Sequence, residues 1–325
     1  MTHWTYDDAP DQTGRTAVVT GANTGIGFET ARMLAHKGAH VTLTYRDAGK
    51  GTAALERIRA EEPAGKVTGA LLDLADLDSV GAFAEAYRAA HDRLDLLINN
   101  AGVMVPPLGR TRQGFELQFG TNHLGHFALT GELLPLLDAA ADADRSDAAR
   151  AGAVRVVTVS SVAHWTGGID LDDLNWRQRR YRPWPAYGQS KLANLLFTLE
   201  LQHRLTEAGS AVRAVAAHPG LTSTDIGRHQ GRAASDNPSR IDRMIRMQPP
   251  DGALPSLRAA TDPTVTGGSY WGPARRFGTY GPPAPARASA RARDTVIARR
   301  LWTESERLTG VTYPFAAIGR AEHPA

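Results

Sequence analysis

The sequence contains no cysteine among its 325 residues, and this absence excludes disulfide bonds and thiolate metal sites. No apolar run approaches the roughly 18 residues that a membrane-spanning helix needs. Residues 1–14 are polar and lack the basic region and apolar core of a signal peptide. We therefore expect a cytoplasmic protein that has no membrane span.

Lysine is scarce as well, because only four of the 37 basic residues are lysines. The arginines form no dense run of the kind that binds nucleic acid, and the net charge is only +3. The charge pattern therefore predicts no nucleic-acid partner. The hydrophobic content of 42% is sufficient for a large core.

Short apolar segments alternate with segments of helical periodicity along the chain. The predicted strands are 16–20, 41–45, 67–72, 94–98, 154–159 and 212–217. The predicted helices are 28–36, 50–61, 77–90, 115–137, one that begins near 187, and 295–308. This alternation predicts an α/β fold: a single Rossmann-like, doubly wound parallel sheet with helices on both faces.

We place this single domain at residues 15–325, after an N-terminal extension of residues 1–14. Insertions at about 162–186 and 221–250 follow the predicted carboxyl ends of strands, where such sheets place substrate-binding loops. A C-terminal extension begins at about residue 273. The insertions contain large apolar side chains, namely Trp165, Trp176, Tyr181, Trp184, Met244 and Met247. They favour an apolar substrate of moderate bulk, or they pack the loops onto the body of the protein.

Tyr187 and Lys191 lie four residues apart, on one face of a predicted helix. Removing the proton of a tyrosine at pH 7 costs about 4 kcal/mol at its ordinary pKa. A nearby ammonium lowers this pKa because it favours the phenolate. The pair therefore predicts an acid–base group, and two hydroxyls, Ser160 and Ser161, end the preceding strand.

A glycine turn lies between the first strand and the first helix, with Gly21, Gly25 and Gly27 spaced G-x-x-x-G-x-G. Glycines in this context let the backbone approach a pyrophosphate at a helix N-terminus. The alternative is a turn that needs glycine only for tight packing. Arg46 follows the second strand and predicts a contact with the 2′-phosphate of NADP(H), whereas the adjacent Asp47 keeps NAD(H) possible.

Polar residues also follow the third and fourth strands. Asp73 could accept a hydrogen bond from an adenine amino group, or it could cap the next helix. Asn99, Asn100 and Gly102 end the fourth strand, where they could line a cofactor or form an ordinary turn.

The long predicted helix at 115–137 contains Asn122 and Gly125, which are poor helix formers, so we expect a local distortion or polar contact there. His123 and His126 have no third metal ligand at a suitable spacing. We therefore interpret them as core or surface histidines and predict no metal site.

Together these motifs resemble the short-chain dehydrogenase/reductase family over roughly residues 14–220. The resemblance rests on Thr20-Gly-Ala-Asn-Thr-Gly-Ile-Gly27, Asn99-Asn-Ala-Gly102, Asn122, Ser161, Tyr187-x-x-x-Lys191 and His218-Pro-Gly220. The stretches Asn-His-Leu-Gly-His-Phe, Val-Ser-Ser-Val-Ala-His and Ser-Lys-Leu-Ala-Asn are similar to its retinol-dehydrogenase-like branch.

The resemblance implies a nicotinamide-dependent oxidoreductase that acts on an alcohol or carbonyl substrate. It implies that Tyr187 is the acid/base, that Lys191 binds ribose and lowers the tyrosine pKa, that Ser161 holds the substrate oxygen, and that Asn122 supports a relay water. Ser161 matches the second serine of the family pattern and is therefore preferred to Ser160. The predicted cofactor contacts are Gly21, Asn23, Thr24, Gly25, Ile26, Gly27, Arg46, Asp73, Leu74, Asn100, Ala101, Gly102, Tyr187, Lys191, Pro219, Gly220 and Thr222.

We expect reversible hydride transfer on an apolar small molecule, with NADP(H) preferred to NAD(H). Two alternatives stay open: a reductase of carbon–carbon double bonds, and a cofactor-binding sensor or structural protein without turnover. The helix from Tyr187 has apolar residues on two sides, which suits burial between neighbouring elements or contact with a second copy in a homo-oligomer.

Overall fold

The computed structural model describes residues 3–144, 152–222 and 247–315, and the strands in these ranges form one eight-stranded sheet. Its order is β3-β2-β1-β4-β5-β6-β7-β8; every neighbouring pair is parallel except the antiparallel pair β7 and β8. The strands are β1 (Thr16–Val19), β2 (His40–Tyr45), β3 (Val67–Leu71), β4 (Leu96–Asn99), β5 (Arg155–Val159), β6 (Arg213–Ala217), β7 (Tyr270–Arg275) and β8 (Tyr280–Pro285).

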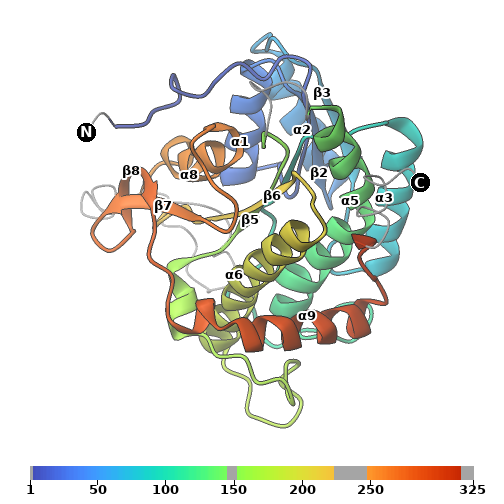
Figure 1. Ribbon diagram of the computed structural model, residues 1–325, viewed down its shortest axis with the longest axis vertical. Coiled ribbons are helices and arrows are strands. Elements are labelled where there is room, and N and C mark those ends of the chain that lie inside the picture. Colours follow the sequence, from blue (N-terminus) through green and yellow to red (C-terminus); the bar gives the residue numbers. More distant parts are fainter. Residues whose placement is uncertain (1–2, 145–151, 223–246, 316–325) are drawn as a thin grey trace.

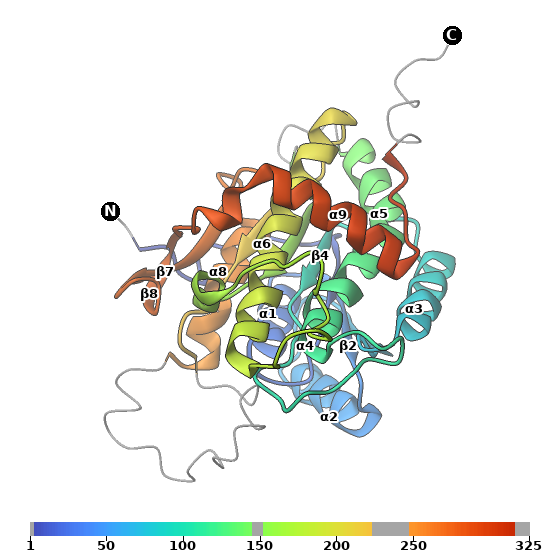
Figure 2. The ribbon, with the colours of Figure 1, turned by 90° about the horizontal axis from the view of Figure 1, so that it is seen from below.

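Helices surround this sheet, as Figures 1 and 2 show. They are α1 (Gly25–His36), α2 (Ala48–Arg59), α3 (Leu77–Ala90), α4 (Leu117–Phe119), α5 (Gly125–Ala143), α6 (Pro183–Glu207), α8 (Pro249–Thr261) and α9 (Thr295–Thr309). Shorter turns are the π-helix η1 (Gly120–Leu124) and the 3₁₀ helices η2 (Val162–Thr166) and η4 (Arg291–Arg293). Within the described ranges, no helix has both the length and the apolarity required to cross a bilayer.

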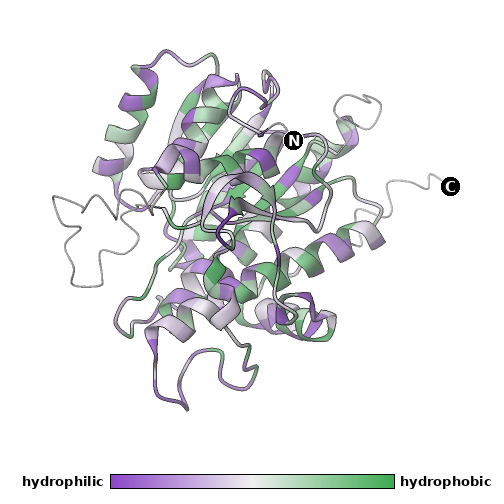
Figure 3. Cartoon of the chain, turned by 90° about the vertical axis from the view of Figure 1, so that its left-hand side faces the viewer, coloured by the Kyte–Doolittle hydropathy of each residue, from purple (hydrophilic) through white to green (hydrophobic). Residues whose placement is uncertain are grey.

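Two apolar cores lie on opposite faces of the sheet, because successive strand side chains alternate between faces. In β1, Ala17 and Val19 join the core under α1, α2 and α8, while Val18 joins the core under α3, α5 and α6. Figure 3 shows apolar segments concentrated where the helices meet the sheet. The predicted doubly wound fold is therefore confirmed.

Three parts of the predicted architecture differ from the structure. No strand was predicted after residue 217, yet β7 and β8 extend the sheet; β8 tolerates its prolines because it is an edge strand. The predicted insertion at 221–250 overlaps α8, which begins with two prolines, Pro249 and Pro250, at positions where proline suits a helix start. For the same reason α6 begins at Pro183, four residues before Tyr187.

The C-terminal helix α9 lies across α5 and α6 (Figures 1 and 2) and is held there by Trp302. The indole is only 2% exposed, and its ring centroid lies 4.9 Å from Phe127, 5.8 Å from Phe197 and 4.5 Å from Tyr313. Part of the apolar surface of α6 is therefore buried within the chain itself.

Replacing Trp302 with alanine should lower the free energy of unfolding by about 3–5 kcal/mol, because the change leaves a large cavity between α5, α6 and α9. Urea unfolding followed by circular dichroism measures this loss. Val296→Ala, at a position of α9 that is 66% exposed, is the matched control and should change stability by about 0.5 kcal/mol or less. A loss below 1 kcal/mol for Trp302→Ala would show that α9 adds little to the fold.

Candidate active site

The predicted catalytic side chains meet where β5 ends and α6 begins. Ser161 follows β5 and accepts a hydrogen bond from the Ala163 backbone N–H at 3.2 Å, which starts η2. Tyr187 is in the second turn of α6, and Lys191 follows one turn later. The Lys191 ammonium donates to the Val159 carbonyl at 3.0 Å, so it ties α6 directly to the end of β5.

Burial controls the protonation of this group. Tyr187 is only 5% exposed, and burial raises its pKa to about 12, against the opposing effect of a hydrogen bond with the Ser161 side chain. The expected lowering of this pKa by Lys191 is therefore not observed. The Lys191 nitrogen lies 5.7 Å from the ring centroid of Tyr187, and burial lowers its own pKa to about 8. At neutral pH the phenol is protonated, the state in which it can donate a proton.

The two adjacent serines have different surroundings. The Ser160 hydroxyl is buried and donates to the Lys191 carbonyl at 2.7 Å, so it fixes α6 against β5. The Ser161 side chain is the one that acts on the pKa of Tyr187. This difference supports the choice of Ser161 made from the sequence.

Asn122 lies in the π-helix η1, so the predicted distortion of this helix is confirmed. Its side chain accepts from the Val103 N–H at 2.8 Å and donates to the Val103 carbonyl at 3.0 Å. It also donates to the Ser190 hydroxyl at 2.9 Å. Asn122 thus joins the segment after β4 to α6, while its support of a relay water stays a prediction. The sequence analysis assigned no role to Ser190, although it begins the Ser-Lys-Leu-Ala-Asn stretch, because its contact with Asn122 joins segments far apart in the chain.

Both histidines of this region are buried in the core. His126 shares a hydrogen bond of 2.9 Å with Thr20, and His123 shares one of 2.8 Å with Ser305 of α9. Burial lowers the pKa of His126 to about 4 and that of His123 to about 3, so both are neutral. Among the described residues, no group of three or more potential ligands could hold a metal ion.

The glycine turn is close-packed against the end of β4. A Cβ on Gly21 would lie 2.9 Å from the Ala101 Cβ, and one on Gly27 would collide with the Asn100 side chain. Close packing is therefore one reason why glycine is required at positions 21 and 27. Gly25 has φ +59°, in the left-handed region that favours glycine, and the first turn of α1 contains no acidic residue. An anionic pyrophosphate fits this helix N-terminus.

Arg46 and Asp47, the two residues after β2 that could determine the cofactor preference, have different contacts. Asp47 is the N-cap of α2 and accepts from the Lys50 N–H at 3.0 Å. Arg46 is exposed, and its side chain makes no hydrogen bond or ion pair with another described residue. An arginine in this position can receive a phosphate, whereas the carboxylate of Asp47 is already used by the helix.

After β3, the cap of α3 is Asp76 and not Asp73. One carboxylate oxygen of Asp73 accepts from the Ala75 N–H at 2.9 Å, and its neighbour Leu74 is buried. The helix-cap alternative for Asp73 is therefore excluded, and the adenine contact stays a prediction.

The end of β4 also lies against the catalytic group. Asn100 donates to the Thr20 carbonyl at 2.8 Å, which holds this turn beside the glycine turn. A Cβ on Gly102 would lie 3.1 Å from the Asn122 Oδ1 and 3.6 Å from the Lys191 nitrogen. A side chain at this position would require the Asn122 amide to shift by a few tenths of an ångström.

The segment after β6 approaches the glycine turn through α8. Gly220 has φ +69°, and the Thr222 hydroxyl donates to the Pro219 carbonyl at 2.7 Å. A Cβ on Gly252 of α8 would lie 2.5 Å from the Thr222 hydroxyl and 2.7 Å from the Ile26 Cδ1. Two predicted cofactor contacts, Ile26 and Thr222, thus pack on either side of Gly252. The sequence analysis assigned no role to this glycine.

The large apolar side chains of the two insertions differ in burial and in their contacts. Trp176 is buried, stacks under Arg179 at 3.9 Å and lies 5.8 Å from the ring of Tyr181. The Tyr181 hydroxyl accepts from the Gln118 side chain at 2.9 Å and donates to the Pro106 carbonyl at 3.2 Å, so it ties the loop to the body of the protein. Trp184 is 53% exposed and lies edge-on to Tyr187 at 6.3 Å. Met247 is buried, and Met244 lies outside the described residues.

These motifs on this fold define a nicotinamide-dependent oxidoreductase, and the sequence comparison agrees: the profile of the short chain dehydrogenase family matches residues 15–234. The chain belongs to this family and is an oxidoreductase acting on CH–OH donors. Retinol dehydrogenase 13 of Homo sapiens is 43% identical over 307 residues, which cover 93% of this chain and 86% of that protein.

Two solved structures are similar over most of the chain. A crystal structure of an uncharacterized protein from Mycobacterium Paratuberculosis has a TM-score of 0.77 and 47% identity, and it covers 96% of this chain and 100% of that one. RhlG of Pseudomonas aeruginosa, in an active-site complex with NADP, has a TM-score of 0.62 and 25% identity, and it covers 80% and 94%.

Proposed function

We propose that the chain is an NADP(H)-preferring oxidoreductase that interconverts an alcohol and the corresponding ketone or aldehyde on an apolar small molecule. The observation that carries this proposal is the buried, protonated phenol of Tyr187, which shares one site with Ser161 and the buried Lys191 ammonium. A carbonyl panel assayed with NADPH and NADH in parallel tests it.

The residues of this chain supply the proton and hold the reacting oxygen. A nicotinamide cofactor, when bound, supplies the hydride. In reduction, Tyr187 donates its proton to the oxygen of the developing alkoxide, and the Ser161 hydroxyl donates a second hydrogen bond to that oxygen. Lys191 keeps a positive charge near this oxygen at neutral pH, since its pKa is about 8.

The substrate class rests on two observations. Trp184 places an exposed indole beside the catalytic phenol, where it can pack against an apolar substrate. The relative with 43% identity is named for an apolar alcohol, retinol. We therefore propose an apolar aldehyde, ketone or alcohol of similar bulk.

The preference for NADP(H) depends on Arg46. Because Asp47 caps α2, Arg46 is the side chain at the end of β2 that can bind a 2′-phosphate. The NADP complex of RhlG, a relative in fold, supports this reading.

Arg46→Asp should reverse the cofactor preference, because a carboxylate repels the 2′-phosphate and accepts from a free ribose hydroxyl. The ratio of kcat/KM for NADPH to that for NADH should fall by at least about tenfold, the loss expected for one charge-assisted contact. Steady-state kinetics with each cofactor measures the ratio. Arg59→Asp, in the last turn of α2, is the control for the change of charge, and an unchanged ratio in Arg46→Asp would contradict the assignment.

The rate of reduction should depend on pH through Lys191. Its ammonium is present below pH 8 and lost above, so kcat/KM should be level from pH 6 to 7 and should fall as the pH rises through about 8. Tyr187, with a pKa of about 12, stays protonated throughout this range. The pH–rate profile of Lys191→Met should lack the fall near pH 8; a fall that persists in this variant would assign it to another group.

A further inference from the structure

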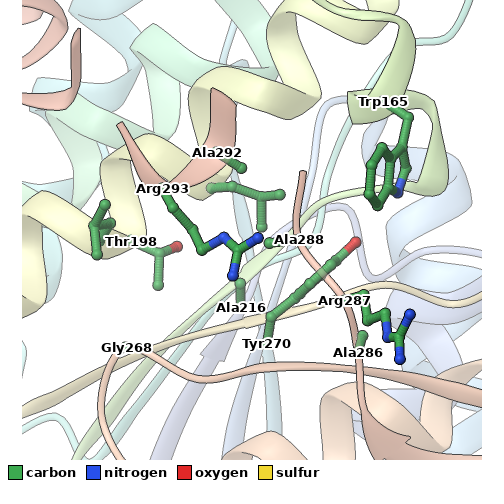
Figure 4. Close-up of a pocket in the computed structure, with 12 residues that line it drawn as sticks. Trp165, Thr198, Ala216, Gly268, Tyr270, Ala286, Arg287, Ala288, Ala292 and Arg293 are labelled. Carbon is green, nitrogen blue, oxygen red and sulfur yellow. The ribbon is translucent and has the colours of Figure 1, made fainter. Parts of the chain in front are cut away.

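A cavity lies between α6, the start of β7 and the C-terminal segment 286–293 (Figure 4). Its volume of about 580 Å³ is in the range of small-molecule sites. None of the predicted catalytic or cofactor residues lines it. This lining distinguishes the cavity from the proposed cofactor site.

The walls of this cavity are largely apolar. Leu195 and Leu199 are one turn apart on α6, and Ala216 of β6 and Ala292 of η4 lie against the same space. Trp165 stands at the edge with 55% of its surface exposed, so it is not buried by the loop that carries it. Such a surface favours a hydrocarbon group over water.

Two arginines give the cavity its charge. Arg287 and Arg293 line it, and neither guanidinium forms a hydrogen bond or ion pair with another described residue. Among the described residues that line the cavity, none has an acidic side chain. In Figure 4, Arg293 and Thr198 lie on one side of the Tyr270 ring, and Arg287 and Trp165 lie on the other. A guanidinium beside an apolar wall is suited to pair with a carboxylate.

We propose that this cavity binds an apolar organic anion, a hydrocarbon body that ends in a carboxylate. The hydrocarbon lies along Leu195 and Leu199, and the carboxylate pairs with Arg287 or Arg293. A neutral alcohol leaves both guanidiniums without a partner, and a cationic amphiphile is repelled by them. The proposal does not depend on the proposed oxidoreductase function, because binding here is measured without turnover.

Isothermal titration of the full-length protein with dodecanoate, below its micelle concentration, tests the proposal. We expect one binding site, and binding of dodecyltrimethylammonium that is at least about tenfold weaker. Arg287→Gln/Arg293→Gln should weaken dodecanoate binding at least about tenfold, since it removes both charge-assisted contacts. Leu199→Trp, at a partly exposed position, fills the cavity and should abolish binding.

Arg299→Gln/Arg300→Gln removes two charges from α9 outside the cavity and should leave dodecanoate binding within about twofold of the wild type, as expected of screened surface charges. Activity with NADPH should be retained in every variant, because none of these residues belongs to the proposed catalytic group. Failure of the wild-type protein to bind dodecanoate would overturn the proposal. So would binding that neither Leu199→Trp nor the double arginine variant weakens, since dodecanoate would then occupy another site.

Discussion

Tyr187→Phe should lower kcat for carbonyl reduction by about 10²–10⁴-fold, the contribution that a positioned general acid makes. Phenylalanine keeps the ring and its burial but has no proton to donate. The phenol of Tyr187 is protonated at neutral pH because burial raises its pKa to about 12. Its removal leaves the developing alkoxide with the Ser161 hydroxyl and the Lys191 charge but without a proton donor. The KM for NADPH should change little. Steady-state kinetics at pH 7 measures both quantities.

Tyr280→Phe provides the matched control, since it makes the same chemical change on the exposed edge strand β8. This variant should retain wild-type turnover. The melting temperature of Tyr187→Phe should stay close to that of the wild type, which separates loss of chemistry from loss of fold. Near-wild-type turnover in Tyr187→Phe would exclude this residue as the proton donor.

Lys191→Met should lower kcat/KM for reduction by about 10²-fold or more, because it removes the positive charge beside the reacting oxygen from a buried, low-dielectric site. It should also raise the KM for NADPH, since the family resemblance makes Lys191 a ribose ligand. Methionine has a similar length and places no unpaired charge in the interior.

The fold should tolerate Lys191→Met, because the Val159 carbonyl also accepts a hydrogen bond from Asn194 at 3.0 Å. Circular dichroism and thermal melting check this point. Lys66→Met, at an exposed position, is the control for the loss of a lysine charge and should keep wild-type kinetics. Wild-type values of both kcat/KM and KM in Lys191→Met would remove Lys191 from the site.

The sequence was most informative where a local pattern is tied to backbone geometry. The alternation of strands and helices predicted β1 to β6 because parallel strands buried on both faces must be short and apolar. The sequence did not predict β7, β8 or α8, because these elements contain prolines, which usually argue against helices and strands. β8 is an edge strand, and the prolines of α8 lie mainly in its first turn, where no backbone donor is needed.

In the candidate site, too, local sequence patterns predicted some features, and other features depend on packing. The spacing of Tyr187 and Lys191 was sufficient to select that pair, the family resemblance selected Ser161, and the structure brings the three together. The direction of the tyrosine pKa was wrong, because sequence reasoning counted the charge of Lys191 but not the burial of the phenol. Contacts that join distant segments, such as Ser190 with Asn122 or Gly252 with Thr222, depend on packing and left no local pattern.

The identity of the product formed from cinnamaldehyde and NADPH tests the central claim most directly, because this substrate offers both a carbonyl and a conjugated double bond. Gas chromatography with mass spectrometry separates the two possible products. The proposed mechanism, in which Tyr187 protonates a carbonyl oxygen, predicts cinnamyl alcohol and its loss in Tyr187→Phe. Formation of hydrocinnamaldehyde would instead assign the site to double-bond reduction, and NADPH binding without turnover of this or any other carbonyl in the panel would contradict an enzymatic role.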